Sequence, residues 1–196
     1  MKKIVWNFIF CLMGILPCGA YSANPAKALP TYSVGDFAQG GVIFWLDPSR
    51  QHGLVCAIEN QSTGAAWLVA LSPLEIGAFA DGIWMGAPNT KFLNDFIEEY
   101  DVVGTFAPKL CGDYRGGAYS DWYLPSALEW ALLYEMTTLV NSVSVAHGGT
   151  AINLIGSYWT STEKDVSNSY AESYLEGKPV STAKSTLCYV RAIRAF

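Results

Sequence analysis

Residues 121–136 read DWYLPSALEWALLYEM, an aromatic extended segment joined to a helix that carries its own start signal. Ser126 is suited to the N-cap. Glu129 stands three residues later, the spacing of a capping box in which each side chain bonds the other residue's backbone N–H. Pro125 restricts the residue before it to extended geometry, so the preceding strand is expected to end there. We predict a reciprocal Ser126–Glu129 cap at the start of a core helix.

The predicted helix has one apolar side. Its apolar residues recur at helical spacing and are expected to face the core: Leu128, Leu132, Leu133, Met136 and Leu139. Residues 141–153 show no such pattern and are predicted to form a loop.

Short strand patterns lie on both sides of this helix. β-Branched and aromatic residues predict strands over 42–46, 53–58, 157–162, 169–175 and 188–196. A second helix is predicted over 90–100, with Thr90 as its cap and Phe92, Phe96 and Ile97 on one face. Residues 61–88 are rich in Gly and Ala without a period, which predicts a long ordered loop. Two helices, short hairpins and long loops indicate an α+β fold.

The beginning of the chain has the pattern of an export signal. Lys2 and Lys3 precede an almost wholly apolar run over 4–16, which is short of the roughly 20 residues that span a bilayer. Cleavage before Ala23 predicts a signal peptide (1–22), a short linker (23–31) and one domain (32–196). The alternatives are an uncleaved anchor and lipidation at Cys18. We expect an exported protein, secreted, at the cell surface or periplasmic, with no integral membrane segment after cleavage.

The chain is acidic. Its net charge is −5, and removal of Lys2 and Lys3 with the signal peptide would make it −7. A protein of this charge is not expected to bind nucleic acid or anionic membrane through bulk electrostatics.

Three cysteines follow the predicted cleavage point: Cys56, Cys111 and Cys188. Oxidising compartments favour a disulfide, and we predict Cys56 with Cys111, the alternative being Cys56 with Cys188. The sequence contains no Cys-x-x-Cys or Cys/His cluster, so a structural zinc site is not expected.

Several motifs, in order along the chain, resemble one bacterial domain family. They are YSVGD (32–36), GGVIFW (40–45), HGLVCA (52–57), DWYLPS (121–126) with Glu129, YWTSTE (158–163) and RAIRAF (191–196). This set resembles the C-terminal globular domain of the Legionella collagen-like adhesin and its relatives. LPSALEW (124–130) is also similar to a motif of the wider C-type-lectin-like and sulfatase-modifying-factor group.

The resemblance implies a C-type-lectin-like fold: a small twisted antiparallel sheet, two helices, long ordered loops and terminal strands that lie close together. It implies a secreted or surface adhesion module, and the adhesin head resembles a trimeric binder of sulfated polysaccharide. This chain has no collagen-like repeat to drive trimerisation, and its negative charge does not favour a polyanionic ligand. Formylglycine-generating relatives use paired cysteines near the C-terminus, where this chain has only Cys188.

Two sets of residues are candidates for ligand contact. Trp67 and Trp84 lie in the Gly-rich segment and suit sugar stacking, with core packing as the alternative. Four basic residues near the C-terminus suit a basic patch, with solvated charge and a salt bridge as the alternative: Lys178, Lys184, Arg191 and Arg194. The remaining motif residues are assigned to the scaffold: Asp121, Trp122, Pro125, Ser126, Glu129 and Trp159. Asp121 is expected to accept hydrogen bonds from loop backbone.

The sequence shows no recognisable set of catalytic residues. His52 and His147 are the two histidines, and the Gly-x-Ser-x-Gly turn of many hydrolases is missing. Asp113, Asp121 and Glu163 are the carboxylates a glycosidase or calcium ion would use, but calcium-lectin and EF-hand motifs do not accompany them. We predict a non-enzymatic binding module for a polysaccharide or other glycan, without cofactor or metal. The alternative is a structural or assembly protein, such as a homotrimer, that binds protein through the apolar 61–88 segment.

Overall fold

The computed structural model describes residues 30–69 and 74–196. The predicted signal peptide (1–22) and all but the last two residues of the predicted linker (23–31) lie outside the described residues. In the part that is described, no helix has both the length and the apolar character needed to cross a bilayer.

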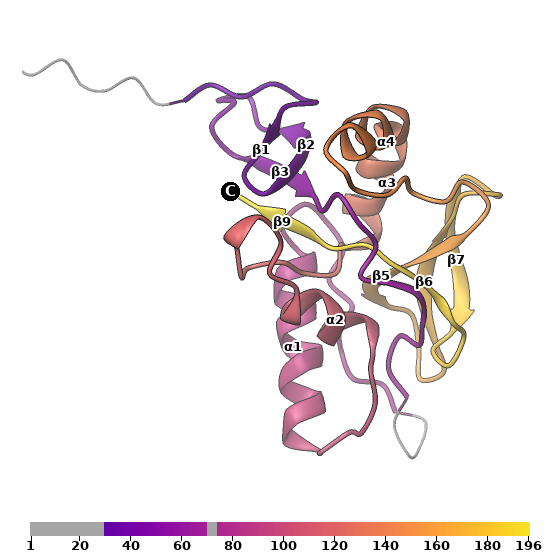
Figure 1. The fold of residues 1–196 in the computed structure, drawn as a ribbon. Coiled ribbons are helices and arrows are strands. Elements are labelled where there is room, and N and C mark those ends of the chain that lie inside the picture. The colour runs from indigo at the N-terminus through magenta and orange to yellow at the C-terminus, as the bar shows by residue number, and fades with distance from the viewer. Residues whose placement is uncertain (1–29, 70–73) are drawn as a thin grey trace, which may run out of the picture.

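The described chain is mixed α+β, and its elements are these (Figure 1): β1 (Phe37–Ala38), β2 (Gly41–Leu46), β3 (Gly53–Cys56), β4 (Ser62–Ala65), α1 (Gly86–Glu99), α2 (Ala107–Asp113), η1 (Gly116–Ala118), α3 (Ala127–Glu135), α4 (Thr137–Ala146), β5 (Ser157–Glu163), β6 (Asn168–Ser173), β7 (Lys178–Ala183), β8 (Cys188–Val190) and β9 (Ile193–Ala195). The strands form two sheets, not one. One has the order β1-β2-β3-β9 and the other β4-β8-β5-β6-β7. Neighbouring strands pair antiparallel except β5 and β8, which are parallel.

The C-terminal segment joins the two sheets. β8 belongs to the five-stranded sheet and β9, three residues further on, to the four-stranded one; Figure 1 shows this segment in yellow running from one sheet to the other. The end of the chain returns to its described beginning, because the rings of Tyr32 and Phe196 meet edge to face at 5.0 Å. The predicted closeness of the terminal segments is therefore confirmed.

Three tryptophans fill the interior. Trp67, Trp130 and Trp159 are fully buried, and each indole N–H donates to a backbone carbonyl oxygen, at 2.7, 2.9 and 2.8 Å respectively. A buried indole is stable only when its N–H has such a partner. Trp122 and Trp159, which the sequence assigned to the scaffold, are both buried in the core.

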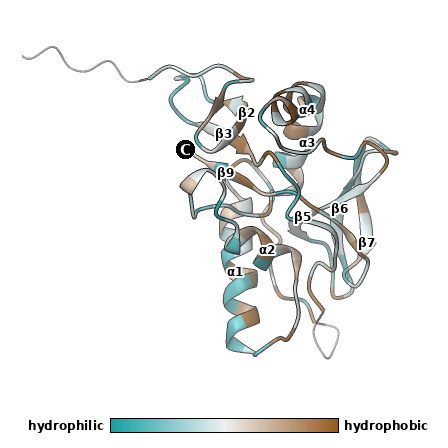
Figure 2. Ribbon diagram, viewed as in Figure 1, coloured by the Kyte–Doolittle hydropathy of each residue, from teal (hydrophilic) through white to brown (hydrophobic). Residues whose placement is uncertain are grey.

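Two helices were predicted, whereas the described residues form four α-helices, with α2 and α4 in addition, and the two predicted helices also differ in their details. α1 begins at Gly86, four residues before the predicted start. Thr90 is not its cap: its hydroxyl is buried and bonds both backbone groups of Leu124, at 3.0 and 3.2 Å. The buried positions of α1 include Leu93 and Ile97, whereas Phe92 is exposed. Hydrophilic and hydrophobic bands alternate along α1 (Figure 2), as expected of a helix with one side in solvent.

The apolar side predicted for the helix after Ser126 is wrong in part. Leu133 is fully buried as predicted, and so is Trp130, which was not predicted. Leu128 on α3 and Leu139 on α4 are exposed. The indole of Trp130 packs edge to face against the ring of Tyr158 at 5.0 Å, and this contact sets which side of the helix faces the sheet. The predicted loop over 141–153 is wrong in its first part, because α4 runs from Thr137 to Ala146.

The predicted disulfide is absent. Cys56, Cys111 and Cys188 are all buried free thiols. Cys56 packs in one apolar cluster, while Cys111 and Cys188 pack in the other, so the predicted partners are divided between two parts of the core. Burial raises the pKa of the Cys188 thiol to about 11 and that of Cys111 still further, so both stay protonated at neutral pH.

Candidate functional site

The structure does not bring the predicted ligand-contact residues together. Trp67 is 0% exposed, so its ring is core and not a surface platform. Lys184 is buried over that ring, 5.2 Å from its centroid, and forms an ion pair with the buried Glu163 carboxylate. Burial against an aromatic ring and a carboxylate leaves this ammonium unavailable to a surface ligand.

Neither arginine of the predicted basic patch is free at the surface. Arg191 is fully buried and donates to Asn60 Oδ1 at 3.1 Å and to the Thr150 carbonyl oxygen at 2.9 Å. Arg194 is nearly buried and holds Asp121 with two parallel bonds, of 2.7 and 2.9 Å. This pair replaces the backbone contacts predicted for Asp121, and the Arg194 bonds lower the pKa of its carboxyl.

Lys178 is the exposed member of the predicted patch, and it lies 3.7 Å from Glu176. A basic surface patch is therefore not formed by these four residues, because three of them are buried by internal partners.

The predicted cap at Ser126 and Glu129 is confirmed. The Ser126 N–H donates to Glu129 Oε2 at 2.8 Å, and the Glu129 N–H donates to Ser126 Oγ at 3.2 Å. The fully buried Glu129 carboxylate also accepts the N–H groups of Trp84 and Gly86, at 2.8 and 3.2 Å, and the hydroxyl of Tyr123 at 3.1 Å. Burial raises the pKa of Glu129, and these donors oppose that rise.

Glu129 thereby holds the loop that carries Trp84. The backbone of Trp84 has a φ of +73°, a left-handed conformation that bulky side chains rarely adopt. Trp84 is 37% exposed, and its ring meets the Trp45 ring edge to face at 5.5 Å. The same loop exposes Phe79, and Asp81 ties it to the start of α3 by accepting the Leu128 N–H at 2.8 Å. Unusual backbone geometry that the surroundings enforce is a feature of functional sites.

Loss of the Ser126 hydroxyl is expected to lower the free energy of unfolding by about 1 kcal/mol, the usual cost of a lost N-cap. Ser126 Oγ also donates to the Gly82 carbonyl oxygen at 2.8 Å, so the Trp84 loop should loosen as well. Urea denaturation of Ser126→Ala tests this, with Ser142→Ala on the exposed side of α4 as the control, expected within about 0.5 kcal/mol of the parent. Equal denaturation midpoints for the two variants would contradict the cap's role.

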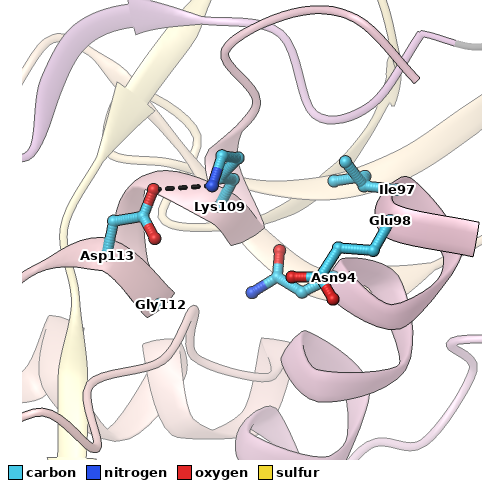
Figure 3. Close-up of a pocket in the computed structure, with 6 residues that line it drawn as sticks. All are labelled: Asn94, Ile97, Glu98, Lys109, Gly112 and Asp113. Carbon is cyan, nitrogen blue, oxygen red and sulfur yellow. Dashed lines mark ion pairs between the residues drawn. The ribbon is translucent and has the colours of Figure 1, made fainter. Parts of the chain in front are cut away.

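A polar pocket of about 200 Å³ lies between α1 and α2 (Figure 3). Its lining residues are Asn94, Ile97, Glu98, Lys109, Gly112 and Asp113. Lys109 Nζ and Asp113 Oδ2 form an ion pair of 2.8 Å across one turn of α2. Of these residues the sequence indicated a functional role only for Asp113, as a possible ion ligand or catalytic acid, and it placed Ile97 on the apolar face of a helix. The pocket was missed because it depends on how two helices pack, which no local motif records.

The three singled-out carboxylates lie in three environments. Asp113 lines the pocket, Asp121 pairs with Arg194, and Glu163 pairs with Lys184. Over residues 30–69 and 74–196, no group of three or more His, Cys, Asp or Glu side chains is placed to hold a metal ion. His147 stacks on Phe37 with ring centroids 3.9 Å apart.

No family model matches the chain, and no curated protein matches it. Among solved structures, the chain is similar to a fimbrial protein from Bacteroides ovatus, with a TM-score of 0.55 and 15% sequence identity. The two share a fold. The match covers 74% of this chain and 36% of the fimbrial protein, so this chain corresponds to about a third of that protein's length.

Proposed function

We propose that this protein is an exported, non-enzymatic binding module that recognises a glycan through the surface around Trp84. The observation that carries the proposal is an exposed indole whose strained backbone is held by the buried Glu129 carboxylate. Sugar-binding sites use such rigid aromatic faces, because a ring that is already fixed loses little entropy on binding. The sequence motifs, the export pattern and the close terminal segments support a C-type-lectin-like arrangement for the scaffold.

A glycan array with the purified protein is the first test. For any glycan that binds, Trp84→Ala is expected to weaken affinity by about tenfold or more, the effect of losing a central aromatic contact. Tyr100→Ala is the matched control, because Tyr100 is an exposed aromatic residue beyond the end of α1, and it should bind as the parent does. If a folded sample binds no host or bacterial polysaccharide on the array, the glycan proposal is wrong. If the two variants lose the same affinity, Trp84 is not the contact surface.

A second candidate is an assembly protein that binds protein, in keeping with its likeness in fold to a fimbrial protein. Two exposed turns lie side by side at one end of the larger sheet, because the Tyr174 N–H donates to the Gly156 carbonyl oxygen at 3.3 Å. These turns display Leu154, Ile155 and Leu175, all strongly exposed. Light scattering after size exclusion distinguishes the candidates: an oligomer that Leu175→Asp dissociates favours assembly, and a monomer at high concentration opposes a homotrimer.

A further inference from the structure

The pocket between α1 and α2 contains an acceptor without a donor. Asn94 Nδ2 donates to the Pro108 carbonyl oxygen at 3.2 Å, whereas Asn94 Oδ1 is buried and has no hydrogen-bond partner among the described residues. A buried carbonyl oxygen left unpaired costs free energy. Asn94 Oδ1 is covered in the unliganded pocket, so a ligand that brings an N–H or O–H group reaches it when the flexible side chains of the lining move aside. Figure 3 shows Asn94 and Glu98 on α1 facing the pocket, with Lys109 and Asp113 on α2 across from them.

The charge of the pocket determines which kind of hydrogen-bond donor the ligand should carry. Glu98 and Asp113 carry two negative charges against the single positive charge of Lys109, and within the described chain Glu98 forms no ion pair that would neutralise it. The hydrogen bond of Lys109 to Asp113 and the negative charge of that carboxylate raise the pKa of Lys109, and the charge of Glu98 adds a smaller rise. The ligand therefore meets a pocket with a net negative charge.

The end of α1 adds to this charge. The C-terminal end of a helix carries the negative pole of its dipole, where basic side chains normally stabilise it. The last turn of α1 has no basic residue; instead Glu98 and Glu99 close the helix and Asp101 follows it. Acidic residues at this position reduce helix stability, and a bound cationic group would remove the cost.

Three kinds of ligand fit less well. A calcium ion takes six to eight oxygen ligands, and the Lys109 ammonium beside Asp113 repels it. A phosphate or sulfate group is repelled by Glu98 and Asp113. A neutral sugar satisfies Asn94 Oδ1 but leaves the surplus carboxylate without a counter-charge.

We propose that this pocket binds the protonated amine of an amino-sugar residue, with Asn94 Oδ1 and the Glu98 carboxylate accepting its N–H bonds. The pocket's volume of about 200 Å³ is below the roughly 300–1,000 Å³ of sites for drug-sized ligands, so it admits about one sugar ring. The inference rests on the proposed glycan function and deepens it: an amine-bearing glycan suits a chain whose net charge is −5 better than a sulfated one does.

The test is an NMR titration of the isotope-labelled protein with three matched sugars, D-glucosamine, N-acetyl-D-glucosamine and D-glucose. Glucosamine is expected to shift the backbone amides of Asn94, Glu98 and Gly112, and the two sugars without a free amine are expected not to. Affinity for glucosamine should fall as the pH rises through the pKa of its amine. Equal shifts with all three sugars would overturn the assignment to an amino sugar. Methylamine binding as tightly as glucosamine would overturn it as well.

Two variants test the residues. Glu98→Gln should weaken glucosamine binding by about tenfold, the loss of one charge-assisted contact. Glu99→Gln is the matched control, since it removes the same charge from the same turn outside the pocket lining, and it should bind nearly as the parent does. Lys109→Met should strengthen binding by removing the one positive charge.

Equal losses in the Glu98 and Glu99 variants would reduce the site to general electrostatic attraction and overturn it. If glycans bind and depend on Trp84 while the pocket amides stay unshifted, this inference fails and the proposed function stands. If the pocket amides shift with glucosamine while no polymeric glycan binds, the pocket is supported and glycan adhesion fails.

Discussion

Replacing Lys184 by methionine is expected to lower the free energy of unfolding by about 3–5 kcal/mol, the cost of leaving a buried charge without its partner. Glu163 is fully buried, and besides Lys184 it accepts the backbone N–H groups of Ile76, Gly77 and Ala78. Those three hydrogen bonds cannot compensate for the lost positive charge. We expect them to weaken when Lys184 is replaced, so the segment beginning at residue 74 should loosen before the rest of the domain.

Urea denaturation and amide hydrogen exchange measure the two effects. The control is Lys178→Met, in the neighbouring strand β7, whose ion pair with Glu176 is exposed at 3.7 Å and is worth at most about 1 kcal/mol. The double variant Lys184→Met with Glu163→Gln should recover part of the loss, because it removes the uncompensated charge. A loss at Lys184 no larger than at Lys178 would show that the pair is not a structural element.

Features that depend on neighbouring residues were predictable. The Ser126–Glu129 cap is set by residues three apart, and the β-branched content of residues 42–46 identified β2. In each case the residues that interact, or the pattern that they form, lie within a few positions of one another. Local hydrogen bonding and side-chain stereochemistry decide these elements, so the sequence contains the necessary information.

Partners from distant parts of the chain were not predictable. Arg194 pairs with Asp121, 73 residues away, and Trp84 is held by Glu129, 45 residues away. Basic residues are usually exposed, which is why Lys184 and Arg191 were expected at the surface. A specific internal partner reverses that tendency, and its presence emerges only when the chain is folded.

The sequence also did not predict correctly which side of a helix faces the core. On α3 the leucine spacing favoured Leu128 and Leu132, but the larger Trp130 occupies the interior, against Tyr158. Burying an indole removes more apolar surface from water than burying a leucine does. The α1–α2 pocket has the same origin: Asn94 and Lys109 are ordinary helical residues until two helices place them opposite each other.

Glu172 is expected to make the protein less stable as the pH rises from about 5 to about 8. Its side chain points to the same face of the sheet as Tyr158, with which it is paired across β5 and β6, and Trp130 of α3 covers that face. The residue is 1% exposed, and its Oε2 has no hydrogen-bond partner in the described part of the chain. Burial raises the pKa of Glu172 from its ordinary 4.5 to about 7.

The sign of the effect follows from proton binding. Between pH 4.5 and about 7 the folded protein holds a proton on Glu172 that the unfolded chain has released, so stability falls as the pH rises through this range and is level above it. A shift of this size corresponds to at most about 3 kcal/mol. Glu172→Gln, which is neutral at every pH, should therefore be more stable than the parent by about 1–3 kcal/mol at about pH 8 and nearly equal to it at about pH 5.

Urea denaturation of both proteins at the two pH values isolates this group, because every other titration is common to them and cancels in the difference. Glu135→Gln, on the exposed side of α3, is the control and should change stability by less than about 0.5 kcal/mol at either pH. The hydroxyl of Tyr174, which lies just beyond the end of β6, is already bonded to Thr137 Oγ1 at 2.9 Å and is not a free donor for this carboxylate. A difference between Glu172→Gln and the parent that is the same at both pH values would show that Glu172 titrates normally, and that water or a small movement of α3 solvates the carboxylate.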